Sequence, residues 1–126
     1  MSLVIEQHGL VEYEQAYRRQ LALVDRLHRE PGHSAVCMLL EHPPVFTLGR
    51  NGKAENVAVS RQFLAERNIS LLNIERGGEI TYHGPGQLVC YPLFNLRSRG
   101  LRVAEFISML ERIMLEVVRA FGIEAG

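Results

Sequence analysis

Cysteine and lysine are scarce in this chain, and their scarcity excludes several kinds of protein. The 126 residues contain two cysteines, Cys37 and Cys90, and a single lysine, Lys53. Two cysteines are too few for a disulfide framework or a metal cluster, and both lie in apolar runs, where a buried reduced thiol is expected. Any mechanism that needs a catalytic lysine must therefore use Lys53 or a lysine from outside this sequence.

The sequence also lacks an excess of charge of either sign and any long hydrophobic run. Lysine and arginine together number 14, as do aspartate and glutamate, so the formal net charge is zero. A general nucleic-acid binder needs a basic excess, so we expect no nucleic-acid partner. No run approaches the length of a membrane span, and the N-terminus lacks the form of a signal peptide. We therefore expect no membrane partner and a location in the reducing cytoplasm.

Length and composition indicate a single folded unit. A chain of 126 residues with 47% hydrophobic and 22% charged residues can bury one core and not two. We therefore expect one domain over residues 1–126. We expect this domain to be incomplete, because the sequence stops after Gly126, where a further strand is predicted to follow.

Hydrophobic periodicity predicts a mixture of strands and helices. Apolar residues three or four apart predict helices over about 11–28 and 103–121, and Ser60 is expected to cap a short helix that ends near Asn68. Strands with segregated helices favour an α+β fold. Shorter apolar runs predict strands over 3–5, 35–40, 45–48, 69–75, 80–82 and 87–95.

Two of these elements carry further expectations. Residues 87–95 are apolar at both odd and even positions, which predicts a strand covered on both faces. The helix over 103–121 has a broad apolar stripe that needs a sheet to cover it, and Gly122 is expected to end the helix with Ile123 behind it. Residues 51–56 are expected to form a polar loop.

The densest chemical signal is RGGEITYHGPGQLVCY, residues 76–91. The paired glycines Gly77 and Gly78 allow positive φ and let a ligand approach the backbone amides, while Arg76 adds a planar positive charge. His83 lies in a second turn rich in glycine and proline, and histidine is the side chain that exchanges protons near neutral pH. From the residues alone, this segment is either a ligand-binding loop or a pair of structural turns.

The stretch RGGEITYHGPGQLVCYPLFNL closely resembles the signature of the octanoyltransferases that begin protein lipoylation. The segment EHPPVFTLGRNGKAENV, residues 41–57, is also similar to that family, as are the basic loop, long helix and FGIEA after the signature. The resemblance implies an acyltransferase that moves an octanoyl group from acyl carrier protein to a lysine of lipoyl domains, in 2-oxoacid dehydrogenases or the glycine cleavage protein. It implies no nucleotide, metal or other cofactor.

The resemblance also implies a fold and a site. The fold is a mixed sheet with helices packed on it, like the catalytic domain of biotin protein ligases and class II synthetases, here truncated. The family works through an acyl-cysteine and a nearby lysine, both downstream of the matched region, so no catalytic residue is expected in this chain. The substrate-binding residues that the motif implies are Arg76, Gly77, Gly78, Glu79, Ile80, Thr81, Tyr82 and His83.

Several alternatives stay open at this point. A relative of lipoate or biotin ligases would form an acyl-adenylate with ATP, and a non-catalytic remnant would bind an acyl chain or a carrier protein without transfer. Cys90 is a disfavoured acyl acceptor, because a thiol in apolar surroundings forms little thiolate. His42 is expected at a strand end near the pocket. The arginines of the basic connection over 97–102 favour a solvated loop, with docking of acidic acyl carrier protein as the alternative.

Overall fold

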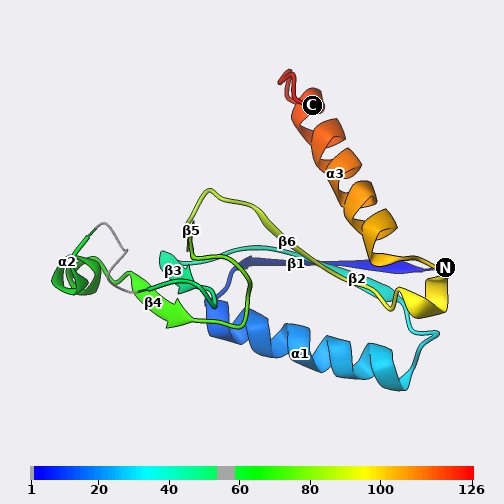
Figure 1. The fold of residues 1–126 in the computed structure, drawn as a ribbon, viewed down its shortest axis with the longest axis horizontal. Helices are drawn as coiled ribbons and strands as arrows, with labels where there is room; N and C mark the ends of the chain where they lie inside the picture. The colour runs from blue at the N-terminus through cyan, green and yellow to red at the C-terminus, as the bar shows by residue number, and fades with distance from the viewer. Residues whose placement is uncertain (1, 54–58) are drawn as a thin grey trace.

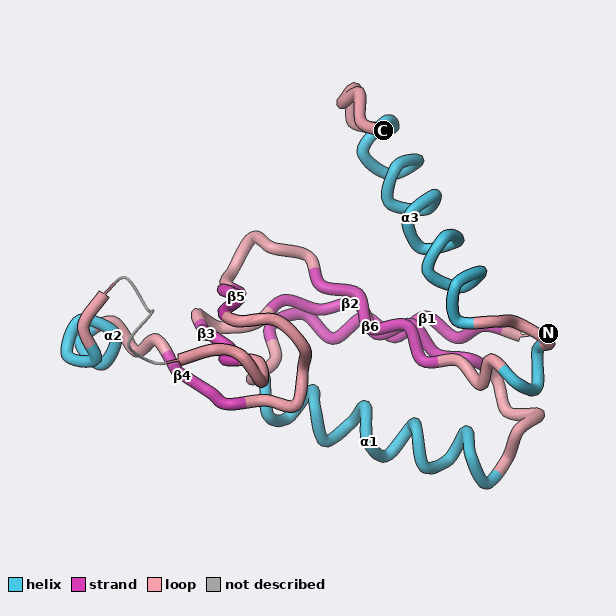
Figure 2. The backbone as a smooth tube through the Cα atoms, in the orientation of Figure 1, coloured by secondary structure: helices cyan, strands magenta, loops and turns pink. Residues whose placement is uncertain are grey.

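The computed structural model describes residues 2–53 and 59–126, and within these ranges it has an α+β architecture, as predicted. Figures 1 and 2 show two small sheets side by side, with α1 beneath the first. The part of the predicted polar loop from residue 54 onward lies outside the described residues. The elements are β1 (Leu3–Leu10), α1 (Tyr13–Arg29), β2 (Ala35–Glu41), β3 (Val45–Leu48), α2 (Arg61–Glu66), β4 (Ser70–Asn73), β5 (Ile80–His83), β6 (Val89–Leu93), a 3₁₀ turn (Arg97–Arg99) and α3 (Val103–Ala120).

Both sheets contain parallel and antiparallel pairs, and their central strands, β2 and β3, are consecutive in the chain. The first sheet has the order β1-β2-β6, in which β2 is parallel to β1 and antiparallel to β6. The second has the order β4-β3-β5, in which β3 is parallel to β4 and antiparallel to β5. Residues 42–44 connect the central strands β2 and β3, so His42 lies where the two sheets meet.

The hydrophobic core lies between α1 and one face of the first sheet. Ala16 and Leu23 of α1 pack against Val36, Met38 and Leu40 of β2, and all five are at most 3% exposed. The α1 face and the alternate residues of β2 have the helical and strand periods that the sequence predicts. This burial holds the start of α1, and with it Tyr13, beside the junction of the sheets (Figure 1).

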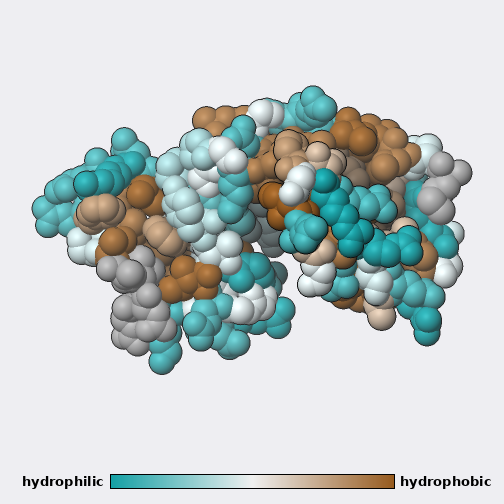
Figure 3. All heavy atoms as spheres, turned by 90° about the horizontal axis from the view of Figure 1, so that it is seen from above, coloured by the Kyte–Doolittle hydropathy of each residue, from teal (hydrophilic) through white to brown (hydrophobic). Residues whose placement is uncertain are grey.

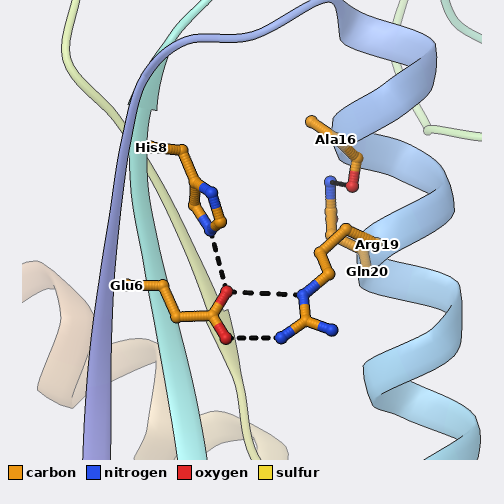
Figure 4. Close-up of polar contacts among 5 residues, drawn as sticks. All are labelled: Glu6, His8, Ala16, Arg19 and Gln20. Atoms are coloured by element: carbon orange, nitrogen blue, oxygen red, sulfur yellow. Dashed lines mark hydrogen bonds and ion pairs between the residues drawn. The ribbon is translucent and has the colours of Figure 1, made fainter.

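A polar contact joins β1 to α1 at the rim of this core. The Glu6 carboxylate accepts hydrogen bonds from Arg19 Nη2 at 2.6 Å and from His8 Nε2 at 2.8 Å, as Figure 4 shows. The hydrogen bond from Arg19 is the main reason that the pKa of Glu6 lies below its usual value. Exposed ion pairs of this kind contribute little stability, about 0–1 kcal/mol. The contact shows that Glu6 and His8 lie on the face of β1 that points toward α1.

The opposite face of the first sheet is open among the described residues. Leu3 and Ile5 of β1 are 51% and 57% exposed on that face, and Cys90 of β6 is exposed beside half-buried Cys37. The expectation that the 87–95 strand is covered on both faces, with Cys90 buried, is therefore wrong. The strand is apolar on both sides, but α1 covers one side only and α3 rises away from the other (Figure 1).

The helix ends follow the predicted capping chemistry. Ser60 Oγ accepts a hydrogen bond from the Phe63 amide at 3.1 Å, which confirms the cap of α2. At the end of α3, the Gly122 amide donates to Arg119 at 2.9 Å and the Ile123 amide to Val118 at 3.1 Å, the paired bonds of a glycine-terminated helix. β1 is longer than predicted, because a register shift at Gly9 lets the strand continue to Leu10.

The apolar stripe of α3 is solvent-exposed. Val103, Ile113, Met114 and Val117 are 64%, 53%, 59% and 52% exposed, and apolar patches are visible on the face of the molecule shown in Figure 3. The helix is anchored at its base, where the rings of Phe94 and Phe106 lie 5.2 Å apart. Exposed apolar patches of this kind bind apolar dyes or drive association.

We expect the chain to bind a fluorescent apolar dye or to self-associate through α3. Ile113→Glu combined with Val117→Glu should weaken both, without unfolding the chain, because both side chains are about half exposed. Glu111→Gln with Glu116→Gln, on the exposed polar residues of the same helix, is the matched control. Dye fluorescence and sedimentation measure the effect, and a wild-type monomer that binds no dye contradicts the expectation.

Candidate functional site

The predicted glycine bend is held by the loop that follows β3. The amides of Gly49, Arg50 and Asn51 donate to the carbonyl oxygens of residues 79, 76 and 78, at 2.6, 2.9 and 3.2 Å. Gly78 has a φ of 84°, which a side chain would strain. The carbonyl side of the bend is thus occupied, whereas the Gly77 and Gly78 amides donate to no described residue. The bend therefore keeps two amide donors that have no partner in the part of the chain the structure describes.

Arg76 is fixed within the protein by its guanidinium group. Nη2 donates to the carbonyl and the hydroxyl oxygens of Thr47, at 3.3 and 3.2 Å, and Nη1 donates to the Gly77 carbonyl at 2.6 Å. Thr47 is fully buried in β3, and the buried Nε of Arg76 has no partner among the described residues. The positive charge is therefore held in place by β3 and by the bend itself.

His83 belongs to a cluster of four rings at the junction of the sheets. Its ring is stacked on Tyr13 at 6.2 Å between centroids and lies 5.7 Å from His42. His42 in turn lies 5.1 Å from Tyr13 and 5.9 Å from Tyr91. These residues come from the start of α1, the connection after β2, the end of β5 and the middle of β6. His42 therefore lies just after the end of β2, the strand-end position that the sequence predicts, and its ring lies beside that of His83.

His42 is the buried centre of this ring cluster. It is 0% exposed, with Nδ1 2.7 Å from the Val11 carbonyl and Nε2 2.8 Å from the Tyr91 hydroxyl. Burial lowers the pKa of His42, because the imidazolium would lose its hydration. Burial also raises the pKa of Tyr91 and of Tyr13, and for Tyr13 the nearby charge of Arg76 opposes the effect. His42 and both tyrosines are therefore neutral at pH 7.

The predicted site residues do not all face the same side. Side chains alternate along β5, so Thr81 and His83 share one face and Tyr82 points to the other. Tyr82 lies instead against Phe46, with 5.1 Å between ring centroids. Within the segment, the structure brings His83 to Tyr13 and Arg76 to Thr47. Ile80 is half-buried opposite Leu48, and Glu79 is exposed.

Two cavities lie between α1 and the second sheet. One of about 590 Å³ is lined from α1 and the strands β3 and β4, and another of about 420 Å³ is lined from α1 and the end of β4. Tyr13 lines both, but residues 76–83 line neither. The predicted acyl site at the bend therefore stays a prediction. Tyr13 connects His83, on which it stacks, to these cavities.

Sequence analysis missed three contributors to this arrangement. Tyr13, Thr47 and Tyr91 were assigned no role in the site. No local pattern marks them, because their contacts join elements up to 70 residues apart. Cys90 lies next to Tyr91 but on the opposite face of β6, exposed and away from the rings.

The structure adds two findings on sites and surfaces. Among residues 2–53 and 59–126, no cluster of three or more histidine, cysteine, aspartate or glutamate side chains could hold a metal ion. In the same ranges, no helix combines the length and the apolar character needed to cross a membrane.

Two arginines of the basic connection over 97–102 have partners. Arg102 pairs with Glu105 at 3.0 Å, and Arg99 lies over the Phe94 ring.

The family of the chain follows from comparison with known proteins. Residues 14–126 match the family model described as the lipoyl protein ligase A/B catalytic domain. The chain belongs to this family. The match includes the glycine bend and three of the four clustered rings, those of His42, His83 and Tyr91, and it begins just after Tyr13. It confirms the family resemblance that the sequence predicted.

Curated relatives narrow the comparison within the family. Proteins named octanoyltransferase are 44% identical over 115 residues in Desulfotalea psychrophila, 40% over 130 in Bacteroides thetaiotaomicron and 42% over 124 in Thiobacillus denitrificans. These matches cover 91%, 100% and 98% of this chain, and 52%, 57% and 53% of the relatives. The chain thus spans about half the length of the curated relatives it matches.

Solved structures give a weaker likeness. A chain from an archaeal lipoylation system of Thermoplasma acidophilum, described as a bi-partite lipoate protein ligase and its E2 lipoyl domain, is 19% identical with a TM-score of 0.46. The likeness covers 70% of this chain and 34% of that one. A TM-score this low carries no weight in assigning the fold.

We expect Gly49→Ala to loosen the bend. A Cβ atom at this position would lie 2.4 Å from the Gly78 carbonyl oxygen and within 3 Å of the carbonyl oxygens of Arg76 and Gly77. Overpacking of this kind costs about 1–3 kcal/mol. Gly32→Ala is the matched control, because a Cβ atom there meets nothing within 4 Å. Urea unfolding measures both, and equal stability of the two variants contradicts the expectation.

We expect the stability of the chain to fall as the pH drops below about 6.5, the ordinary value for histidine. Because the pKa of His42 is lowered in the folded state, the unfolded state binds a proton that the folded state does not. The free energy of unfolding therefore decreases from about pH 6.5 down to the lowered pKa, by up to about 1.4 kcal/mol per pH unit.

Urea unfolding between about pH 7.5 and pH 5.5 tests this dependence, since that range spans the ordinary histidine pKa. His42→Gln should flatten it, whereas His28→Gln, on the exposed end of α1, should leave it unchanged. The Glu6 carboxylate also has a lowered pKa, but it titrates below this range. A pH dependence that survives in His42→Gln contradicts the assignment to His42.

Proposed function

We propose that this chain carries the acyl-binding part of an octanoyltransferase of protein lipoylation. The octanoyl group is transferred from acyl carrier protein to a lysine of a lipoyl domain, in 2-oxoacid dehydrogenases or the glycine cleavage protein. The observation that carries the proposal is the identity of 38–44% with proteins named octanoyltransferase. The single-domain organisation over residues 1–126 and the cytoplasmic location stay predictions.

The geometry of the bend supports an acyl-thioester site. The amides of Gly77 and Gly78, which donate to no residue in the described ranges, are suited to the carbonyl oxygen of a thioester, where negative charge develops during acyl transfer. Arg76, fixed on Thr47, adds a positive charge that need not reorganise when the substrate binds. We therefore propose the segment over residues 76–83 as the part of the site that binds the thioester head.

The proposed reaction is covalent catalysis. A cysteine sulfur displaces the carrier thiol from the octanoyl carbonyl, and the amine of the lipoyl-domain lysine then displaces the cysteine sulfur, leaving an amide. By family resemblance, this cysteine and an assisting lysine are not among the residues of this chain. The role of residues 76–83 is to bind the thioester and to stabilise its carbonyl oxygen.

Binding of octanoyl-acyl carrier protein tests the proposal. We expect calorimetry to show that octanoyl-acyl carrier protein binds more tightly than the carrier without its acyl group. Mass spectrometry should show no acyl-adenylate when the chain is mixed with octanoate and ATP. Adenylate formation would favour a ligase. Equal affinity for the two carriers would contradict an acyl site and leave a role in binding the carrier alone.

The Arg76→Ala variant tests whether octanoyl-acyl carrier protein binds at the bend. Loss of a charged hydrogen-bond donor costs about 1.5–3 kcal/mol, which corresponds to a loss of at least about tenfold in affinity. Arg29→Ala, on the exposed end of α1, is the control. Because Arg76 also bonds Thr47, the stability of each variant is measured alongside. Unchanged affinity in folded Arg76→Ala contradicts the placement of the substrate at the bend.

A further inference from the structure

Gln87 has a contact with His83 that the proposed function does not use. The side-chain oxygen Oε1 of Gln87 lies 2.6 Å from Nδ1 of His83, and its Nε2 donates to the Tyr82 carbonyl at 3.5 Å. The Gln87 amide also donates to the Gly84 carbonyl at 3.1 Å, which closes the turn between β5 and β6. Backbone and side chain together thus fix Gln87 beside the imidazole.

These contacts determine which nitrogen of His83 carries the proton. The Tyr82 carbonyl can only accept, so the Gln87 amide group must present its NH₂ to Tyr82 and its oxygen to His83. An amide oxygen can also only accept, so Nδ1 of neutral His83 must be the donor. Nε2 therefore carries the lone pair, and no described residue forms a hydrogen bond with it.

His42 shows the same arrangement with its second nitrogen occupied. Its Nδ1 faces the Val11 carbonyl, which again requires a proton on Nδ1. Its Nε2 lone pair is then taken by the Tyr91 hydroxyl, which stays protonated because burial raises the pKa of Tyr91. The two neighbouring imidazoles therefore have the same tautomer. They differ in that the acceptor nitrogen of His42 is used, whereas that of His83 accepts from no residue within 2–53 and 59–126.

We propose that Gln87 is a positioning residue that holds His83 in the Nδ1–H tautomer, so that His83 accepts a hydrogen bond from its ligand. A neutral imidazole in this state cannot donate to a carbonyl oxygen from Nε2. The ligand at His83 must therefore present an N–H, O–H or S–H group.

The inference has two parts. The positioning half is that Gln87 sets the tautomer of His83, and the ligand half is that His83 accepts a hydrogen bond from a substrate group. The ligand half rests on the proposed function. The thioester carbonyl is an acceptor, which suits the Gly77 and Gly78 amides, unpartnered among the residues that the structure describes. The thioester group itself has no N–H or O–H, so the hydrogen bond to His83 comes from another group of the substrates. The amine of the accepting lysine is such a donor. His83 would then orient the amine rather than the acyl group.

Nitrogen NMR of the free chain tests the positioning half without any substrate. At alkaline pH, the ¹⁵N shifts of the imidazoles distinguish the Nδ1–H tautomer from the Nε2–H tautomer, which is the more populated form in water. We expect Nδ1–H for both His83 and His42 in the wild type. In Gln87→Leu, His83 should change toward Nε2–H while His42 keeps its tautomer, which also reports that the junction is still folded.

Gln87→Glu is the matched variant, because a carboxylate oxygen can still accept from Nδ1. It should restore the wild-type tautomer of His83, which a purely structural role of Gln87 would not require. The positioning half is overturned by an Nε2–H tautomer of His83 in the wild type, or by an unchanged Nδ1–H tautomer in Gln87→Leu.

Two small amides test the ligand half. N-methyloctanamide and N,N-dimethyloctanamide share the acyl chain, but only the first has an N–H group. NMR titration should show that the first binds about two- to tenfold more tightly in the wild type, the range of one hydrogen bond, and that Gln87→Leu removes the difference. Equal binding in the wild type overturns the ligand half alone. Binding of neither amide overturns it together with the proposed acyl site, while the tautomer result stands independently.

Discussion

The arrangement of this protein depends on one buried imidazole. His42 is fully buried at the point where β2 leads into β3, and it bonds the backbone before α1 and the hydroxyl of β6. Its ring also contacts Tyr13 and His83. A buried polar side chain is stable only when its donors and acceptors are satisfied, so this residue ties both sheets and α1 to a single geometry. The candidate site is a consequence of that junction.

A second constraint acts on the glycine bend. Three amides of the loop after β3 hold its carbonyl oxygens, and Arg76 is fixed on the buried hydroxyl of Thr47. The same contacts leave the amides of Gly77 and Gly78 without a partner among the described residues. A bend that is rigid on one side and unsatisfied on the other is suited to binding an acceptor atom of a ligand. Rigidity matters because donors that are already in place need no reorganisation during the reaction.

Local signals in the sequence predicted the local parts of this structure. The Ser60 cap, the Gly122 helix end and the periods of α1 and α3 follow from residues within a few positions of each other. The apolar run over 87–95 gave a wrong expectation, that the strand is covered on both faces. An apolar pattern on both sides of a strand does not show which elements pack against those sides. Local motifs also could not predict that Tyr13 stacks on His83, since the two residues are 70 positions apart.

The glycine and arginine motif was recognisable from the sequence, but its contacts were not. The family resemblance implied that Arg76 to His83 form one substrate-binding segment, whereas the alternation along β5 turns Tyr82 to the other side and Arg76 bonds inward to Thr47. Gln87 was part of the motif without a role of its own. Its role becomes visible only when the Tyr82 carbonyl and the His83 ring are seen on either side of it.

The most direct test of this account is where an octanoyl thioester lies on the chain. Intermolecular nuclear Overhauser effects between an octanoyl thioester and the protein distinguish the two surfaces that could bind it, the candidate site and the exposed apolar stripe of α3. The account predicts contacts from the thioester end to the ring protons of Tyr13 and His83 and to the amides of Gly77 and Gly78. Contacts confined to the exposed stripe of α3, around Ile113 and Val117, would contradict it.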